Sequence, residues 1–307
     1  MKVIRTADAL ERDGRKVCVA IGFFDGVHLG HQQIIRQTIA DARQHEALSL
    51  VVTFDRHPNT VVAPNRVPPL IYSLPQKLRV IGTLGCSALL LVHFDKPFSE
   101  QSGDSFIRKL AHDLGQLQSL CVGSNFTFGH KRSGDVALLK TLGDELKFTV
   151  HGMSAVSLGG KIVSSTRIRD TIRNGDLDAA GQMLGRAYSL SGQIIRGDQL
   201  GRQLGFPTAN LEVSELVLPP NGVYAVHAEV EDRTHRAVVN IGCRPTLKNP
   251  APQLRVEVHL LDFNGDLYDR EMEVTFVDKL REEKAFPSLD ALKEQIGQDI
   301  AEARLRF

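Results

Sequence analysis

Residues 17–31 read VCVAIGFFDGVHLGH, and this stretch decides the fold of the first half of the chain. Residues 17–23 form a short apolar run, which is typical of a strand buried on both faces of a sheet. A glycine-containing turn follows, and a helical pattern of spaced isoleucines begins at His31. Strand, turn and helix in this order predict the first β-α unit of a parallel sheet.

The same alternation continues to about residue 185. Strand-like runs lie at 49–54, 88–94, 119–123 and 148–153, and the helix-like segments that accompany them lie at 75–85, 102–115 and 136–146. Strands separated by helices favour parallel pairing. We therefore predict an α/β, Rossmann-like domain over residues 1–185, with a parallel sheet and flanking helices.

From residue 188 the pattern changes to strands without helices. Strand-like segments, separated by Gly, Pro, Asn and Asp turns, lie at 189–197, 222–230, 235–242, 254–263 and 271–280. Such strands must pair largely antiparallel, which predicts a small sandwich or closed barrel. A helical pattern ends the chain, with Ser288 as its N-cap. We predict a second domain over residues 186–307, a small all-β barrel with a terminal helix.

The composition excludes several classes of protein. The 307 residues suit two domains, and 37 Lys and Arg against 36 Asp and Glu give a net charge of +1, which does not suit a general nucleic-acid binder. No apolar run is long enough to span a membrane, and the charged N-terminus lacks the apolar core of a signal peptide. Four scattered cysteines without a CxxC pair disfavour zinc and disulfides. We expect a cytoplasmic protein that binds neither nucleic acid nor membrane; its oligomeric state is not readable.

His28 and His31 are three residues apart at a predicted helix start, so they share one face of its first turn. Free N–H groups and the helix dipole attract phosphate there, and Gly26 and Gly30 let a ligand approach the backbone. Two imidazoles can donate hydrogen bonds to a triphosphate. A bare histidine pair is more often solvated, and zinc would need a third ligand. The strand-turn-helix context favours the phosphate interpretation.

This stretch resembles the HxGH signature of the nucleotidyltransferase superfamily, in particular the N-terminal module of the bacterial bifunctional riboflavin kinase/FMN adenylyltransferases, the FAD synthetases. The second signature of that module is similar to SSTRIR at 164–169, which precedes a predicted helix with Ser165 or Thr166 as N-cap. The resemblance implies catalytic roles for His28, His31 and Arg167. It implies ATP binding by Gly22, Phe24, Asp25, His28, Gly30, His31, Ser164, Thr166 and Arg167.

Two further stretches resemble the flavin-side segments of that module. They are Phe54 with the His57-Pro58 pair, and VGSNFTFG at 122–129. The resemblance implies flavin binding by Phe54, His57, Asn125 and Phe128. Many relatives carry Asp and Arg where this chain has Asn125 and Thr127. Asn125 can still form a hydrogen bond, but it carries no charge. From the residues alone, ordinary core packing explains the phenylalanines equally well.

GRQLGFPTAN at 201–210 predicts a rigid loop that a ligand can approach closely, and it is not a Walker A loop. Thr208 can offer a hydroxyl to Mg²⁺, and Asn210 a carbonyl oxygen. Alone, such a cluster is more often a plain turn. It resembles the nucleotide-binding motif of riboflavin kinases. The resemblance implies ATP binding by Gly201, Gly205, Thr208 and Asn210, with Thr208 and Asn210 as magnesium ligands.

Glu257 lies in the strand-like stretch LRVEVHLLDF. Period-two alternation places Leu254, Val256, Val258 and Leu260 on one face and Glu257 on the other. A carboxylate there is usually only solvated, but the resemblance implies that Glu257 is the base for the riboflavin 5′-hydroxyl. It also implies flavin binding by Tyr224, Arg281 and Glu283, although a solvated charge run fits 280–284 equally well. Relatives usually have Gly where this chain has Asp269.

The resemblance covers residues 17 to 300 and implies two successive reactions. Riboflavin and ATP give FMN and ADP at the barrel, and FMN and ATP give FAD and pyrophosphate at the parallel sheet. Mg²⁺ would accompany ATP, with neither zinc nor a tightly bound metal. One alternative is a nucleotidyltransferase that acts on a pantetheine or nicotinate phosphate and carries a passive barrel. The predicted kinase residues from Thr208 to Glu257 disfavour this alternative, because a passive barrel would not need them. Another is a catalytically dead flavin-binding regulator, which the intact catalytic residues disfavour.

Overall fold

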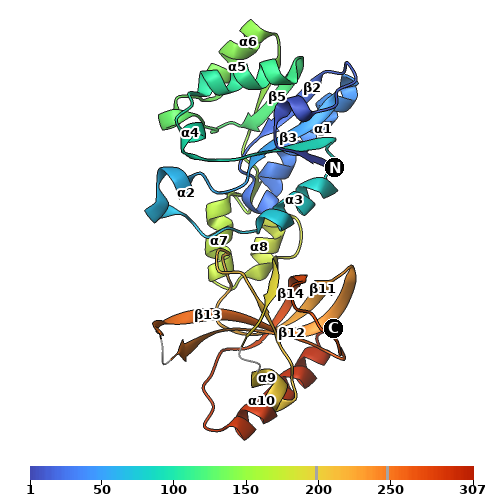
Figure 1. The fold of residues 1–307 in the computed structure, drawn as a ribbon, viewed down its shortest axis with the longest axis vertical. Coiled ribbons are helices and arrows are strands. Elements are labelled where there is room, and N and C mark those ends of the chain that lie inside the picture. Colours follow the sequence, from blue (N-terminus) through green and yellow to red (C-terminus); the bar gives the residue numbers. More distant parts are fainter. Residues whose placement is uncertain (198–199, 247–248) are drawn as a thin grey trace. The chain divides into compact units, whose positions relative to one another are not determined.

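The computed structural model describes residues 1–197, 200–246 and 249–307. At residues 200, 243–246 and 249–253 it describes the main chain alone. By packing, the chain forms two compact units, residues 1–68 with 74–165, and residues 69–73 with 166–307 (Figure 1). The predicted domain boundary between residues 185 and 186 stays a prediction.

A parallel sheet forms the first unit, as predicted. Its strand order is β1-β4-β3-β2-β5-β6, and every neighbouring pair is parallel. The strands are β1 (Lys2–Ile4), β2 (Val17–Ile21), β3 (Leu48–Phe54), β4 (Ala88–Val92), β5 (Leu117–Gly123) and β6 (Thr149–Met153). Edge strand β1 is additional to the prediction.

Helices cover both faces of this sheet. They are α1 (Leu29–Gln44), α3 (Leu74–Thr83), α5 (Gly103–Leu114) and α6 (Val136–Leu146). Ile35 of α1 and Ile81 of α3 share one core with Val51, while Ile107 of α5 belongs to a second core with Leu50. Because successive residues of β3 enter opposite cores, every residue of the strand is buried.

Shorter elements complete the first unit. They are η1 (Ala7–Ala9), η2 (Asp25–Val27), α2 (Asn59–Val62), η3 (Pro64–Arg66), α4 (Lys96–Ser99), η4 (His130–Arg132), β7 (Ser157–Leu158) and β8 (Lys161–Ile162).

A closed antiparallel barrel forms most of the second unit, in the order β10-β13-β12-β11-β14-β9. Its strands are β9 (Ser189–Ile195), β10 (Ala209–Leu211), β11 (Gly222–Val230), β12 (Arg233–Thr246), β13 (Asn249–Leu260) and β14 (Glu271–Arg281); its longer helices are α7 (Ser165–Arg173), α8 (Leu177–Leu184) and α10 (Leu289–Arg304). Ser288 accepts a hydrogen bond from the Ala291 N–H, which confirms the predicted N-cap of α10. β9 closes the ring because it pairs with both β10 and β14.

Two expectations for the barrel were wrong. A short helix, α9 (Leu200–Leu204), and strand β10 occupy the stretch that we expected to be a loop between helix-free strands. Both are too short to show a period in the sequence. Leu254 is 46% exposed instead of buried, because β10 flanks β13 only at Glu257 and Val258. Leu254 lies beyond that doubly paired part.

The described cysteine side chains, Cys18, Cys86 and Cys121, are buried and form no disulfide. Burial raises the pKa of Cys86 to about 11 and that of Cys121 to about 12, so both thiols stay protonated at neutral pH. Within the described residues, no three His, Cys, Asp or Glu side chains gather into a group that could hold a metal ion. None of the described helices is both long and apolar enough to cross a bilayer.

Candidate functional site

The predicted phosphate-binding turn connects β2 to α1. Gly22 follows β2 and donates its N–H to the Val52 carbonyl at 3.1 Å, and His28 occupies the N-cap position of α1. A Cβ on Gly22 would lie 2.7 Å from the Phe24 ring, and one on Gly30 would lie 3.2 Å from the His28 imidazole. Both glycines are therefore required by the close packing of the neighbouring rings.

His28 and His31 lie against each other within this turn. Their rings stack with centroids 3.6 Å apart, and the edge of the Phe24 ring lies against His31 at 5.3 Å. His28 is only 6% exposed, and His31 is half-buried. In the part of the chain that the structure describes, the buried Nδ1 of His31 has no hydrogen-bond partner.

Electrostatics keep His31 neutral at pH 7. Burial first, and then the charges of His28 and Lys77, hold the pKa of His31 well below 6.5. A neutral imidazole offers one donor and one acceptor nitrogen. The turn therefore presents His31 as a dipolar hydrogen-bonding group beside the helix N-terminus, where anions are favoured.

The remaining nucleotide residues from the sequence occupy different surroundings. Phe24 belongs to the apolar core, so only its main chain can reach a ligand. Asp25 is buried, and its carbonyl accepts a hydrogen bond from Ser165 Oγ at 3.1 Å. Helix α7 begins at Ser165, so Ser165 and Thr166 lie in its first turn. Arg167 follows in α7, half-buried.

A cavity of about 670 Å³ lies in the first unit, and its floor is aromatic. Phe54, His57 and Phe128 line it together, as the flavin prediction requires. The other rings that line it are Phe23, Phe94, Phe98, Phe106 and Phe126. The Phe126 and Phe128 rings stack at 5.2 Å. The cavity can therefore accept a large flat apolar ring system.

The rim of this cavity is cationic. Lys96, His130, Lys131 and Arg132 line it, and no carboxylate is among its lining residues. Asn125 is exposed and lies outside that lining, as do His28 and His31. The structure thus brings together three of the four flavin residues predicted for the first unit, and it leaves Asn125 and the histidine pair outside the cavity lining.

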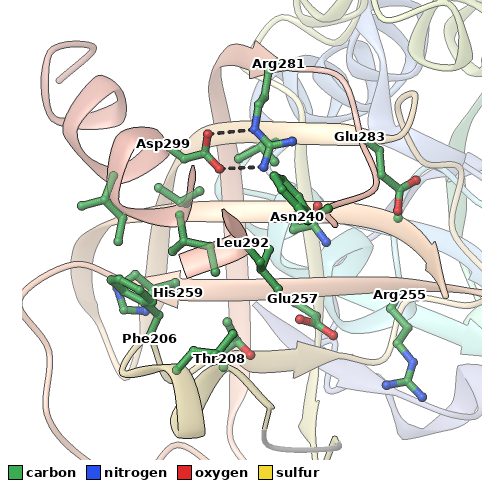
Figure 2. Close-up of a pocket in the computed structure, with 18 of the residues that line it drawn as sticks. Phe206, Thr208, Asn240, Arg255, Glu257, His259, Arg281, Glu283, Leu292 and Asp299 are labelled. Carbon is green, nitrogen blue, oxygen red and sulfur yellow. Dashed lines mark hydrogen bonds and ion pairs between the residues drawn. The ribbon is translucent and has the colours of Figure 1, made fainter. Parts of the chain in front are cut away.

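A second cavity, of about 280 Å³, opens on the barrel. Thr208, which directly precedes β10, Asn210 of β10, Glu257 of β13 and Asn240 of β12 line it. In the strand register Asn210 faces Glu257, and Glu257 faces Asn240, so these three side chains form a row across three adjacent strands. Figure 2 shows the Glu257 side chain, from β13, and the Thr208 side chain, from the segment just before β10, at the pocket.

The loop before β10 shapes one wall of the barrel cavity. Gly201 lines the cavity, and a Cβ there would collide with the Phe206 carbonyl. Gly205 has φ +91°, a conformation that favours glycine, and it ends α9 outside the cavity lining. Phe206 packs edge-on against His259, whose Nδ1 donates to the Pro207 carbonyl at 2.8 Å. The loop is therefore anchored to β13 beside Glu257.

Arg281 and Glu283 lie at the opposite wall. Arg281 donates to both carboxylate oxygens of Asp299, at 2.8 and 2.7 Å, and Asp299 is only 4% exposed (Figure 2). Glu283 accepts a hydrogen bond from Asn221 at 2.9 Å and lies over Gly242, where a Cβ would collide with its carboxylate. The ion pair ties the end of β14 to α10, so the guanidinium position is fixed before any ligand binds.

Tyr224 lies outside the cavity lining. It is 2% exposed, its hydroxyl donates to the Pro220 carbonyl at 2.5 Å, and its ring packs edge-on against Phe276. Burial first, and then the charge of Glu282, raises the pKa of Tyr224 to about 12. Tyr224 therefore serves the barrel core. Asp269 has φ +63°, which explains a glycine preference at that position.

Sequence reasoning missed Asn240, His259 and Asp299 in the barrel cavity. His259 follows Glu257 by two residues, so the period-two alternation could have placed it on the same face. Asn240 reaches the cavity through the register between β12 and β13, and Asp299 reaches it through the packing of α10. Strand register and helix packing produce no local pattern in the sequence.

Comparison with known proteins places both cavities within matched regions. A family model described as FAD synthetase matches residues 10–167, and one described as riboflavin kinase matches residues 184–307. A bifunctional riboflavin kinase/FMN adenylyltransferase from Pseudomonas fluorescens is 38% identical over 99% of this chain and 97% of its own length. One from Escherichia coli K12 is 37% identical over 100% and 98%. A crystal structure titled as a macrolide-efflux protein from Streptococcus pneumoniae aligns over 98% of both chains, with a TM-score of 0.82 and 28% identity.

The substitution Asp299→Asn tests whether the ion pair with Asp299 holds the Arg281 guanidinium in place. We expect the variant to lose about 3 kcal/mol of unfolding free energy, because it leaves Arg281 without the charge that offsets its desolvation. Urea denaturation followed by circular dichroism measures this loss. Asp262→Asn is the control, because it breaks the exposed ion pair between Asp262, which follows β13, and Arg304 of the same helix α10. Equal stability of the two variants would contradict the assignment.

Proposed function

Because the chain belongs to the family of bifunctional riboflavin kinase/FMN adenylyltransferases, we propose that its two cavities carry the two reactions of that family separately. The protein is a transferase that phosphorylates riboflavin to FMN and adenylylates FMN to FAD. We assign the first reaction to residues 186–307 and the second to residues 1–185. The carboxylate-amide row of Asn210, Glu257 and Asn240 carries the kinase assignment.

In the kinase reaction we assign the role of general base to Glu257. Its carboxylate accepts the proton of the riboflavin 5′-hydroxyl as that oxygen attacks the γ-phosphorus of ATP. Gly201 and Gly205 admit the nucleotide close to the loop, and Arg281 and Glu283 bound the flavin side. Of the predicted flavin residues in this unit, Tyr224 acts by shaping the barrel wall.

The residues of the barrel cavity suit Mg²⁺ bound together with ATP. Thr208 and Asn210 place a hydroxyl and an amide oxygen beside the Glu257 carboxylate, and oxygen donors are what this cation prefers. So few protein ligands are typical of Mg²⁺ that is shared with substrate phosphates. When bound, Mg²⁺ would offset the negative charge of the phosphates.

In the adenylyl transfer the FMN phosphate attacks the α-phosphorus of ATP, and pyrophosphate leaves. The attacking group is already an anion, so no base is needed. We assign charge stabilisation to His28, His31 and Arg167, aided by the N–H groups of the turn from Gly22 to Gly30. Phe54, His57 and Phe128 hold the flavin ring, and the cationic rim suits a phosphorylated flavin. Because both reactions consume ATP, we propose a cytoplasmic location.

Replacing His28 and His31 together by alanine should stop FAD formation while FMN accumulates. Loss of a single donor of this kind typically lowers the rate by about 10²–10³. Chromatography of products from riboflavin, ATP and Mg²⁺ measures both steps in one reaction. The kinase step is the internal control for folding, and FAD synthesis at the wild-type rate would refute the assignment of the histidines.

Glu257→Gln or Thr208→Ala should abolish riboflavin phosphorylation and leave the conversion of FMN to FAD intact. Glutamine keeps the size of the side chain but accepts no proton. Supplying either riboflavin or FMN to each variant separates the two activities. Parallel loss of both activities in a folded variant would argue against two separate sites.

A fragment of residues 187–307 should phosphorylate riboflavin on its own, because it contains the whole barrel and α10. A fragment of residues 166–307 is the matched control, because it adds α7 and α8, which pack with the same unit. If only the longer fragment is active, the functional boundary lies before α7 and not near residue 185.

A further inference from the structure

Lys77 of α3 is a buried cation that the reactions described above do not use. It is 4% exposed. Its Nζ donates to the Phe54 carbonyl at 2.9 Å, to the Phe23 carbonyl at 3.2 Å and to Thr53 Oγ1 at 3.4 Å. An ammonium has three N–H donors, so these acceptors use all of them. Lys77 therefore acts on the protein itself and does not bind substrate directly.

The acceptors of Lys77 come from two central strands. Phe54 ends β3, and Phe23 lies two residues beyond the end of β2, where the next residues enter the histidine turn. Thr53 Oγ1 also donates to the Phe23 carbonyl at 2.9 Å, and the Phe23 ring centroid lies 4.3 Å from Nζ. Lys77 thus joins the carboxyl ends of β2 and β3 where both the turn and the aromatic cavity begin.

We propose that Lys77 is a positioning residue for adenylyl transfer, which fixes the start of the histidine turn and supplies a positive charge that acts on His31. The proposal rests on the assignment of His31 to that reaction. Nothing in the sequence pattern indicated this role, because a lysine in a surface helix ordinarily faces water.

The charges around Lys77 support this role. Burial lowers the pKa of Lys77 to about 8, against the opposing attraction of Asp25 and Asp55, so the ammonium stays mostly charged at pH 7. Asp55 is itself engaged by His93 at 2.6 Å and by Arg56 at 3.5 Å. Burial first, then the charge of His28 and then that of Lys77, lowers the pKa of His31.

The effect of the Lys77 charge on the His31 pKa makes adenylyl transfer depend on pH in a way that can be tested. If the Lys77 charge is removed, one cause of the lowered His31 pKa disappears, and that pKa rises. His31 then becomes protonated at a higher pH than in the wild type. The acidic limb of the adenylyl-transfer profile should therefore move to higher pH, which a purely structural role of Lys77 would not produce.

Lys77→Met removes the charge and the donors, and Thr53→Val is the matched control, which loosens the same junction and keeps the charge. We expect Lys77→Met to lower kcat/KM for FMN adenylylation about ten- to a hundredfold, because a small displacement of catalytic groups has effects of that size. Riboflavin phosphorylation by the same full-length protein should be unchanged. If Lys77→Met does not fold, Lys77→Gln replaces it, because glutamine retains donors without the charge.

The decisive measurement is the titration of the His31 ring protons by NMR in each variant, together with the pH profile of adenylyl transfer. We expect both to move to higher pH in the lysine variants and to stay in place in Thr53→Val. An unmoved His31 titration in the lysine variants, or an equal shift in Thr53→Val, overturns the proposal. Full activity of the His28→Ala, His31→Ala protein would instead remove the assignment of His31 on which it rests.

Discussion

The register of β13 in the barrel determines what the kinase cavity contains. Val256 and Val258 are 1% exposed, and Glu257 between them faces the cavity. A shift of one residue would exchange their faces, bury a carboxylate and remove the base from the site. The apolar side chains of β13 therefore fix the position of a catalytic group through the free energy of burial, and the neighbouring strands add Asn210 and Asn240 to the same row.

In the parallel sheet, the functional groups are positioned at the strand ends and not on a strand face. Its central strands are buried on both faces and have no free face for polar groups. Chemistry must therefore be placed where the strands end, and His28, His31, Phe54 and the aromatic cavity all lie beyond or at those ends. The turn between β2 and α1 is crowded as a result, and Phe24 and Val27 take positive φ values of 55° and 41° there. Such a conformation persists only where surrounding contacts maintain it, as Lys77 and Thr53 do at Phe23.

The sequence was informative wherever burial produced a period or a continuous run. It predicted the apolar strands of the parallel sheet, the antiparallel barrel and the capped terminal helix, because each buries a recognisable apolar pattern. It missed β1 and β10, which have three residues each and depend on pairing with distant strands. Among site residues, alternation placed Glu257 on the face opposite the apolar side chains, and the resemblance to the family then assigned roles to Glu257 and to the two histidines. Asn240 and Lys77 were not, because strand register and helix docking place them, and both are tertiary.

Closure of the barrel through β9 has a consequence for biosynthesis. β9 pairs with β14, and the hydrogen bond from Ser189 to Glu273 links residues 84 positions apart. A ribosome must therefore translate as far as β14 before the first barrel strand finds its last partner. The strands of the parallel sheet, by contrast, are all synthesised by Met153. The nascent polypeptide can thus complete its parallel sheet while the barrel is still open, and unpaired barrel strands stay exposed to misassembly until β14 has been synthesised.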